Sequence, residues 1–80
     1  MEGGDVSTLD PAGLRTARTQ AGLTQAQLAQ AVGVSRKTIN TIENGVFIPS
    51  TLLALKLARA LDSAVETLFA LAPEDRSENQ

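Results

Sequence analysis

The chain has 80 residues, a formal net charge of −2, and neither cysteine nor histidine. Its length fits one small domain, and the missing residue types exclude a disulfide framework, the usual metal ligands and the commonest catalytic acid–base group. Because no paired carboxylates or glycine-rich phosphate loop replace them, the sequence predicts neither an enzyme nor a metal or cofactor site.

The first segment, residues 1–9, contains glycine, serine and threonine and is expected to be a flexible leader. It lacks the basic start and the apolar segment of a signal peptide. No apolar run elsewhere approaches the roughly 20 residues that a membrane span requires. The sequence therefore predicts a cytoplasmic protein without a membrane association.

The first helix is predicted to begin at Asp10-Pro11, because a capping residue followed by proline suits a helix start. Gly22 marks its end. Its buried stripe follows the helical spacing i, i+3, i+4, i+7 and consists of Leu14, Ala17, Arg18 and Ala21.

Two short helices follow, each with its own start and stop signals. The first covers Gln25–Val32, with Thr24 as its cap and Gly33 just beyond its end, and the second covers Arg36–Glu43, with Ser35 as its cap. Hydroxyl caps satisfy backbone N–H groups at a helix start, and glycine accommodates the left-handed conformation after a helix end. Two such helices joined by a glycine turn predict a helix-turn-helix, whose second helix commonly enters the DNA major groove.

Two further helices complete the predicted domain. Ser50 caps a fourth helix that reaches about Leu61, and a fifth helix covers about Val65–Leu71. Residues 73–80 form a polar, acidic tail that is expected to be disordered. No segment alternates as a strand does, so the sequence predicts an all-α, compact five-helix domain over residues 10–72.

The third helix separates into two faces when its residues are spaced at about 100°. Ile39 and Ile42 lie on one face, and the opposite arc carries Arg36, Lys37, Asn40, Thr41 and Asn44. All five side chains can donate a hydrogen bond: Arg and Lys match guanine, Asn matches adenine, and the threonine methyl packs on thymine. An ordinary solvated face is the alternative, but the helix-turn-helix context favours DNA binding.

Arg18 interrupts a stripe that is otherwise apolar. A buried charge is costly unless it is paired, and Glu43 is the single acid between residues 11 and 61. We therefore expect an Arg18–Glu43 ion pair that ties the first helix to the third. The alternative is that Arg18 reaches solvent along its aliphatic stem.

Three residues are candidates for binding backbone phosphate. Gln25 stands at the first position of its helix, where free N–H groups and the helix dipole favour an anion. Its amide either grips that phosphate or bridges to the third helix, and plain solvent exposure is the remaining alternative. Ser35, and Asn44 with the backbone after Gly45, are the other two candidates.

The net negative charge weakens a nucleic-acid interpretation without refuting it, because the charges are unevenly distributed. Most acids lie near the two ends of the chain, whereas the bases between residues 11 and 61 are Arg15, Arg18, Arg36, Lys37, Lys56 and Arg59. Phosphates respond to the local field, since distant charges are screened over roughly 10 Å. With only two phenylalanines as aromatics, a base-stacking platform for single strands is not expected.

These residues together form a recognisable pattern. In chain order it consists of Leu14-Arg15, Arg18, Gly22-Leu23-Thr24-Gln25, Leu28-Ala29, Val32-Gly33-Val34-Ser35, Thr38-Ile39, Ile42-Glu43-Asn44-Gly45, Pro49-Ser50 and Leu68-Phe69. The chain resembles the Cro/lambda-repressor-type helix-turn-helix family, also called the XRE family, over about residues 12–70. The resemblance implies that Arg18 pairs with Glu43 and that Gln25 touches phosphate. The base-reading residues it implies are Arg36, Lys37, Asn40 and Thr41.

Several positions depart from the family pattern. Leu52 lies where a polar residue is usual, Thr51 replaces a leucine, and Ala64 lacks the usual hydroxyl cap. Asp62-Ser63 also stand where a glycine and an apolar residue are common. The connection at residues 46–48 lacks the basic residues that some relatives use on phosphate, which suggests a modest affinity.

Exposed leucines on the fourth helix predict a two-fold interface. Leu52 and Leu55 share a side of this helix with Lys56 and Arg59, away from the core leucines. Such domains usually act as dimers, and a dimer doubles the footprint on a palindromic site. The candidate interface residues are Leu52, Leu55, Phe69 and Leu71.

The sequence thus predicts a sequence-specific double-stranded DNA-binding transcriptional regulator. We expect a homodimeric repressor that inserts residues 36–43 into the major groove of a pseudo-palindromic operator. No small-molecule ligand is expected. The alternative is an antitoxin or another protein-interaction module with autoregulatory DNA binding, in which the acidic tail from Glu74 would meet the partner.

Overall fold

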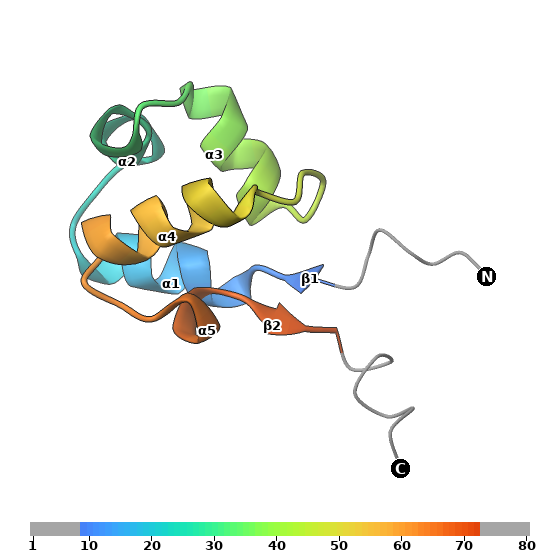
Figure 1. The fold of residues 1–80 in the computed structure, drawn as a ribbon. Coiled ribbons are helices and arrows are strands. Elements are labelled where there is room, and N and C mark those ends of the chain that lie inside the picture. Colours follow the sequence, from blue (N-terminus) through green and yellow to red (C-terminus); the bar gives the residue numbers. More distant parts are fainter. Residues whose placement is uncertain (1–8, 73–80) are drawn as a thin grey trace, which may run out of the picture.

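The computed structural model describes residues 9–72, which form five helices and one small sheet (Figure 1). In chain order the elements are β1 (Leu9–Asp10), α1 (Ala12–Gln20), α2 (Gln25–Val32), α3 (Arg36–Glu43), α4 (Thr51–Ala60), α5 (Val65–Leu68) and β2 (Ala70–Leu71). The predicted five-helix architecture is confirmed. Of the expected leader and tail, residues 1–8 and 73–80 lie outside the described residues.

The bounds of α2 and α3 agree with the predicted ones because their caps form as expected. Thr24 Oγ1 accepts a hydrogen bond from the Gln27 backbone N–H at 3.0 Å, while the Gln27 side chain accepts one from the Thr24 N–H at 2.9 Å. Gly33 ends α2 with φ of +80°, in the left-handed region that glycine adopts without strain. Ser35 Oγ accepts from the Thr38 N–H at 3.1 Å and so begins α3.

The two ends of the fold differ from the prediction. β1 and β2 pair antiparallel, with Leu9 opposite Leu71, so the expected leader is one residue too long. The fifth helix ends at Leu68 rather than Leu71, because Phe69 is already extended, with φ −134° and ψ 147°. Two-residue strands are too short to show an alternating pattern, and their hydrogen bonds depend on a partner some 60 residues away in the chain.

The start of α1 differs from the prediction by a small shift. The helix begins at Ala12, with Asp10 in the strand before it. Asp10 Oδ1 still accepts a hydrogen bond from the Ala12 N–H at 3.0 Å. Pro11 therefore precedes the helix instead of standing at its first position as predicted, and the Asp10 carboxylate accepts from the first helical N–H from within the strand.

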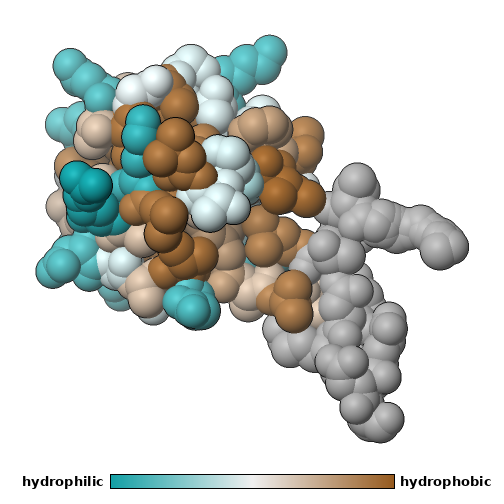
Figure 2. Space-filling model, in the orientation of Figure 1, coloured by the Kyte–Doolittle hydropathy of each residue, from teal (hydrophilic) through white to brown (hydrophobic). Residues whose placement is uncertain are grey.

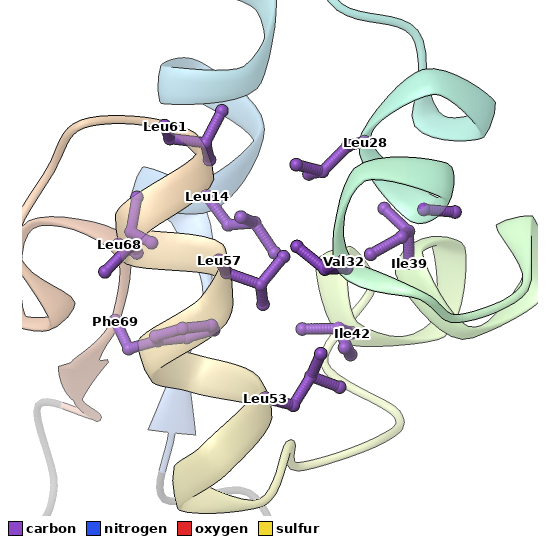
Figure 3. Close-up of a cluster of buried hydrophobic side chains, with 12 residues drawn as sticks. Leu14, Leu28, Val32, Ile39, Ile42, Leu53, Leu57, Leu61, Leu68 and Phe69 are labelled. Atoms are coloured by element: carbon purple, nitrogen blue, oxygen red, sulfur yellow. The ribbon is translucent and has the colours of Figure 1, made fainter.

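All five helices contribute to one hydrophobic core (Figure 3). Its fully buried large side chains are Leu14, Leu28, Ile39, Ile42, Leu57 and Leu68. α2 packs against α3 and α4, while α1 packs against α5 and also meets α3. Within residues 9–72, none of the helices is both long and apolar enough to cross a membrane.

Gly13 allows α1 and α5 to approach closely. A Cβ atom at this position would clash with the backbone carbonyl of Thr67. Backbone atoms cannot move aside as a flexible side chain can, so α5 would have to shift away from α1.

Candidate nucleic-acid interface

α3 presents its predicted polar arc on the surface of the domain. Arg36, Lys37 and Asn44 are exposed, whereas Asn40 and Thr41 are half-buried. The opposite face carries Ile39 and Ile42 into the core, and these two side chains anchor the helix. The structure therefore brings all the predicted base-reading residues to one side of α3.

Thr41 has its hydroxyl committed within its own helix. Thr41 Oγ1 donates to the backbone oxygen of Thr38 at 2.9 Å. Its own carbonyl accepts from the N–H groups of Val46 and Phe47, at 2.9 and 3.2 Å, and so shapes the chain after α3. The methyl group is then the part of Thr41 that is suited to an outside contact, such as a thymine methyl.

Arg18 and Glu43 lie together as an ion pair between α1 and the end of α3. Arg18 Nε lies 2.6 Å from Glu43 Oε2, and Arg18 Nη2 lies 3.1 Å from Glu43 Oε1. A further bond from Arg18 Nη1 reaches the backbone oxygen of Leu23 at 2.9 Å. The Arg18 side chain is only 12% exposed and that of Glu43 is 0% exposed, so Arg18 does not extend into solvent.

Arg15 joins the same carboxylate, which sequence reasoning missed. Its Nε lies 3.3 Å from Glu43 Oε1, and its Nη2 donates to Asn44 Oδ1 at 3.3 Å. The Arg15 side chain remains 55% exposed. Its position three residues before Arg18, on the same side of α1, was the available signal.

Gln25 bridges to α3, which is one of its two predicted roles. Its Nε2 donates to Glu43 Oε1 at 3.0 Å, and its Oε1 accepts from Asn40 Nδ2 at 3.4 Å. The Gln25 amide is thereby held at the start of α2, beside α3. A phosphate contact by Gln25 remains a proposal.

The charge state of Glu43 follows from competing effects. Burial alone raises the pKa of this carboxyl, but hydrogen bonds from Arg18 and Gln25, the charge of Arg18 and a hydrogen bond from Arg15 outweigh it. The net pKa lies below its ordinary value, so Glu43 is ionised at neutral pH. A buried carboxylate thus ties α1, α2 and α3 together.

The remaining phosphate candidates lie at the two ends of α3. Ser35 is exposed, and its Oγ both caps the helix and lies 3.0 Å from Thr38 Oγ1. Asn44 is exposed at the other end, where its Nδ2 donates to Asn40 Oδ1 at 3.2 Å. In residues 9–72, no group of three or more acidic side chains is placed to hold a metal ion.

The predicted dimer residues fall into two groups. Leu52, Leu55 and Leu71 are 63%, 55% and 55% exposed. Phe69, in contrast, is only 7% exposed and belongs to the core, so the prediction that it lies in a dimer interface is wrong. The Phe69 ring belongs to the same buried cluster as Leu53, Leu57 and Leu68, so it is not available to a partner chain.

An apolar groove lies next to these leucines. It has a volume of about 230 Å³, and its lining includes Ile48, Ala54, Leu55, Val65 and one wall formed by Phe69. Figure 2 shows apolar side chains gathered over the face on which α4 lies. This face differs from the polar arc of α3, so an apolar contact and a DNA contact need not compete.

The comparisons with known proteins agree with this geometry. Residues 14–72 match the helix-turn-helix family model HTH_3. The chain is 41% identical over 58 residues to YgzD of Bacillus subtilis, named an uncharacterized HTH-type transcriptional regulator, covering 72% of this chain and 88% of that protein. A relative from Methanothermobacter thermautotrophicus with the same type of name is 46% identical over 59 residues, covering 72% and 86%.

Solved structures support the same assignment. The restriction-modification controller protein C.AhdI of Aeromonas hydrophila superposes with a TM-score of 0.68 and 38% identity, over 72% of this chain and 84% of that one. The P22 c2 repressor, solved with a synthetic operator, gives a TM-score of 0.69 and 29% identity, over 72% and 88%. The chain therefore belongs to the helix-turn-helix family of Cro/lambda-repressor-type regulators.

Proposed function

We propose that this helix-turn-helix regulator acts in the cytoplasm as a homodimeric repressor on a pseudo-palindromic double-stranded DNA operator. In each half-site α3 enters the major groove, where its first two residues and the two residues one turn further on face the base edges. The base-reading residues are Arg36, Lys37, Asn40 and Thr41. Gln25, Ser35 and Asn44 bind the flanking phosphates, and the occupied operator blocks a promoter.

One observation carries the base-reading part of the proposal. The exposed arc of α3 carries only side chains that can donate hydrogen bonds, and its first two positions, Arg36 and Lys37, are cations. The major groove offers guanine N7 and O6 as acceptors for such cations. Glu43 is bound by Arg18 of α1 and by Gln25 of α2, so it fixes α3 against both of these helices. The exposed arc of α3 is therefore presented as a rigid surface.

The charge of the described domain suits a phosphate surface better than the net charge suggests. Residues 9–72 carry six basic and four acidic side chains. One of the acids, Glu43, is buried against two arginines and adds little field outside. The binding face is therefore cationic, and its affinity for DNA should fall as salt increases.

Dimer formation is supported by the apolar face beside α4. Leu52 and Leu55 are more than half exposed there, next to the apolar groove. A two-fold axis through this face would present two copies of α3 to half-sites about one helical turn apart. The repressor role is supported by the similarity to the P22 c2 repressor. The antitoxin alternative depends on the acidic residues after 72, and nothing in residues 9–72 favours it.

Selection of random duplex DNA by the purified protein, followed by sequencing of the bound pool, tests the proposal. We expect enrichment of an inverted repeat whose half-sites are about 10 base pairs apart. A single enriched half-site would contradict the dimer but retain sequence-specific binding. No enrichment, even at low salt, would refute DNA recognition and direct the search to a protein partner.

A further inference from the structure

A closed path of hydrogen bonds starts at Arg15 on α1, follows the exposed arc of α3, and returns to Arg15. Arg15 Nη2 donates to Asn44 Oδ1 at 3.3 Å, and Asn44 Nδ2 donates to Asn40 Oδ1 at 3.2 Å. Asn40 Nδ2 donates to Gln25 Oε1 at 3.4 Å, and Gln25 Nε2 donates to Glu43 Oε1 at 3.0 Å. Arg15 Nε closes the circle on that same oxygen at 3.3 Å.

The two ends of this path determine how every amide in it is oriented. The Arg15 guanidinium can only donate, and the ionised Glu43 carboxylate can only accept. An asparagine or glutamine amide turned over anywhere between them would place two donors or two acceptors face to face. The circle is therefore consistent with one orientation of each amide.

Asn40 stands in the middle of this path, on the arc that faces the groove. Its oxygen is directed to Asn44 and its nitrogen to Gln25. These bonds use one of the two lone pairs and one of the two amide hydrogens. The remaining acceptor and donor match adenine, which presents N6 as donor and N7 as acceptor in the major groove.

We propose that Arg15, acting through Asn44, fixes the Asn40 amide in the orientation that reads adenine. Each operator half-site then contains one adenine whose recognition depends on a residue of α1. Arg15 is a positioning residue in this scheme, and Asn40 makes the contact. The inference rests on the proposed function, and it adds the base read by one position of α3.

The expected size of the effect follows from preorganisation. Ordering one side chain before binding is worth about 2- to 12-fold in affinity. The advantage exists only where Asn40 engages its base, so it contributes to the preference for adenine at that position. Preferences set by Arg36 and Lys37 do not depend on this path.

The experiment is random-duplex selection with wild-type protein and matched variants. Asn40→Ala should abolish the preference for adenine at one position of each half-site, which identifies that position. Arg15→Ala and Asn44→Ala should lower the same preference by about 2- to 12-fold and leave the base preferences at the other positions unchanged. Loss of the proposed Asn44 phosphate contact lowers the affinity for all sequences alike, because such a contact carries no base preference. Arg59→Ala, which removes an exposed arginine from α4, is the charge-matched control and should change no preference.

The double variant Arg15→Ala/Asn44→Ala separates a relay from two independent contacts. A relay predicts the same adenine preference as in either single variant, because each breaks the same path. Multiplying effects would contradict it. Asn44→Ala leaves the Arg15–Glu43 pair in place, so it remains informative if thermal melting shows Arg15→Ala to be poorly folded.

Several outcomes would overturn this inference while leaving the proposed function intact. One is a wild-type operator whose preferences all survive Asn40→Ala. Another is a uniform loss of affinity in Arg15→Ala with a shallower salt dependence, which would make Arg15 a phosphate contact. Failure of the wild-type protein to enrich any sequence would instead overturn the proposed function, and the inference with it.

Discussion

The Glu43 carboxylate accepts hydrogen bonds from Arg15, Arg18 and Gln25, and it is shielded from water. Removing one partner of a buried ion pair leaves the other uncompensated, and this is costlier than replacing both. The side chain therefore stabilises the fold mainly by matching Arg18, which is itself 12% exposed. The consequences are measurable in stability as well as in binding.

Glu43→Ala should lower the free energy of unfolding by about 3–5 kcal/mol, because Arg18 would remain buried without its carboxylate. Urea denaturation of both proteins measures the difference. Glu66→Ala, which removes an exposed acid from α5, is the control and should cost no more than about 1 kcal/mol. An equal decrease in the free energy of unfolding for Glu43→Ala and Glu66→Ala would show that the buried ion pair stabilises the fold no more than an exposed acid does.

The pH dependence of stability follows from the lowered pKa of Glu43. Because the folded-state pKa lies below the ordinary value of 4.5, the ionised carboxylate stabilises the fold above that pH. This contribution is lost as the pH falls from 4.5 through the lower folded-state pKa. The difference in the free energy of unfolding between wild type and Glu43→Gln should therefore become smaller as the pH falls. A difference that stays constant from pH 7 to pH 3 would contradict this assignment.

Arg36 and Lys37 begin the exposed arc of α3 and should make the strongest base contacts. Replacing either by alanine should cost about 1–3 kcal/mol of affinity for the selected operator. Fluorescence anisotropy on operator and scrambled duplexes measures the change. Lys56→Ala removes the same kind of charge from α4 and controls for long-range attraction. A loss as large on the scrambled duplex as on the operator would assign the residue to phosphate instead.

Side-chain pairing was predictable from the sequence only where few partners were available. Arg18 broke an apolar stripe, and Glu43 was the single acid in the region, so their pairing could be deduced. The contacts of Arg15 and the orientation of Gln25 depend on side-chain directions at a three-helix junction. The spacing of Arg15 and Arg18 places both on one side of α1, but it does not give the direction in which each side chain points.

At the scale of elements, local signals predicted α2 and α3 to their end residues. Hydroxyl caps at Thr24 and Ser35 act within one helical turn, so no distant contact is needed to place them. The end of α5 and the sheet could not be found in this way. Their positions depend on the pairing of Leu9 with Leu71, two residues that are close in space but far apart in the chain.

The contact between α1 and α5 should be sensitive to a single added carbon. Gly13→Ala places a Cβ against the Thr67 carbonyl, so the two helices must separate at a cost of about 1–3 kcal/mol. Thermal melting should show a clear decrease in Tm. The control is Thr16→Ala on the exposed side of α1. A Tm for Gly13→Ala at or above that of wild type would contradict the close approach.

At the scale of the whole molecule, the separation of an apolar face from a cationic one would allow one small domain to make both of the proposed contacts, with a second copy and with DNA. The groove beside α4 and the arc of α3 use different residues. A second copy can therefore cover the leucines while both recognition helices stay accessible. The spacing along the fourth helix predicted exposed leucines, but the groove also needs Leu9, Ile48 and Val65, which come from other parts of the chain.

Leu55→Glu should disrupt the dimer, because a two-fold axis brings two unpaired charges into one apolar contact. Sedimentation equilibrium should show a dimer dissociation constant raised by about tenfold or more. Val46→Glu, at an equally apolar position that is 76% exposed and lies outside the groove lining, is the control. If both variants dimerise as wild type does, the interface lies elsewhere.

The affinity of the wild-type protein for three duplexes tests sequence-specific recognition by a dimer most directly. They are the selected operator, the same operator with five base pairs inserted between its half-sites, and a scrambled sequence. We expect a complex of two chains on the first duplex, and binding at least about tenfold weaker on the second. Half a turn places the second half-site on the opposite side of the DNA. Equal affinity for all three duplexes would contradict sequence-specific recognition by a dimer.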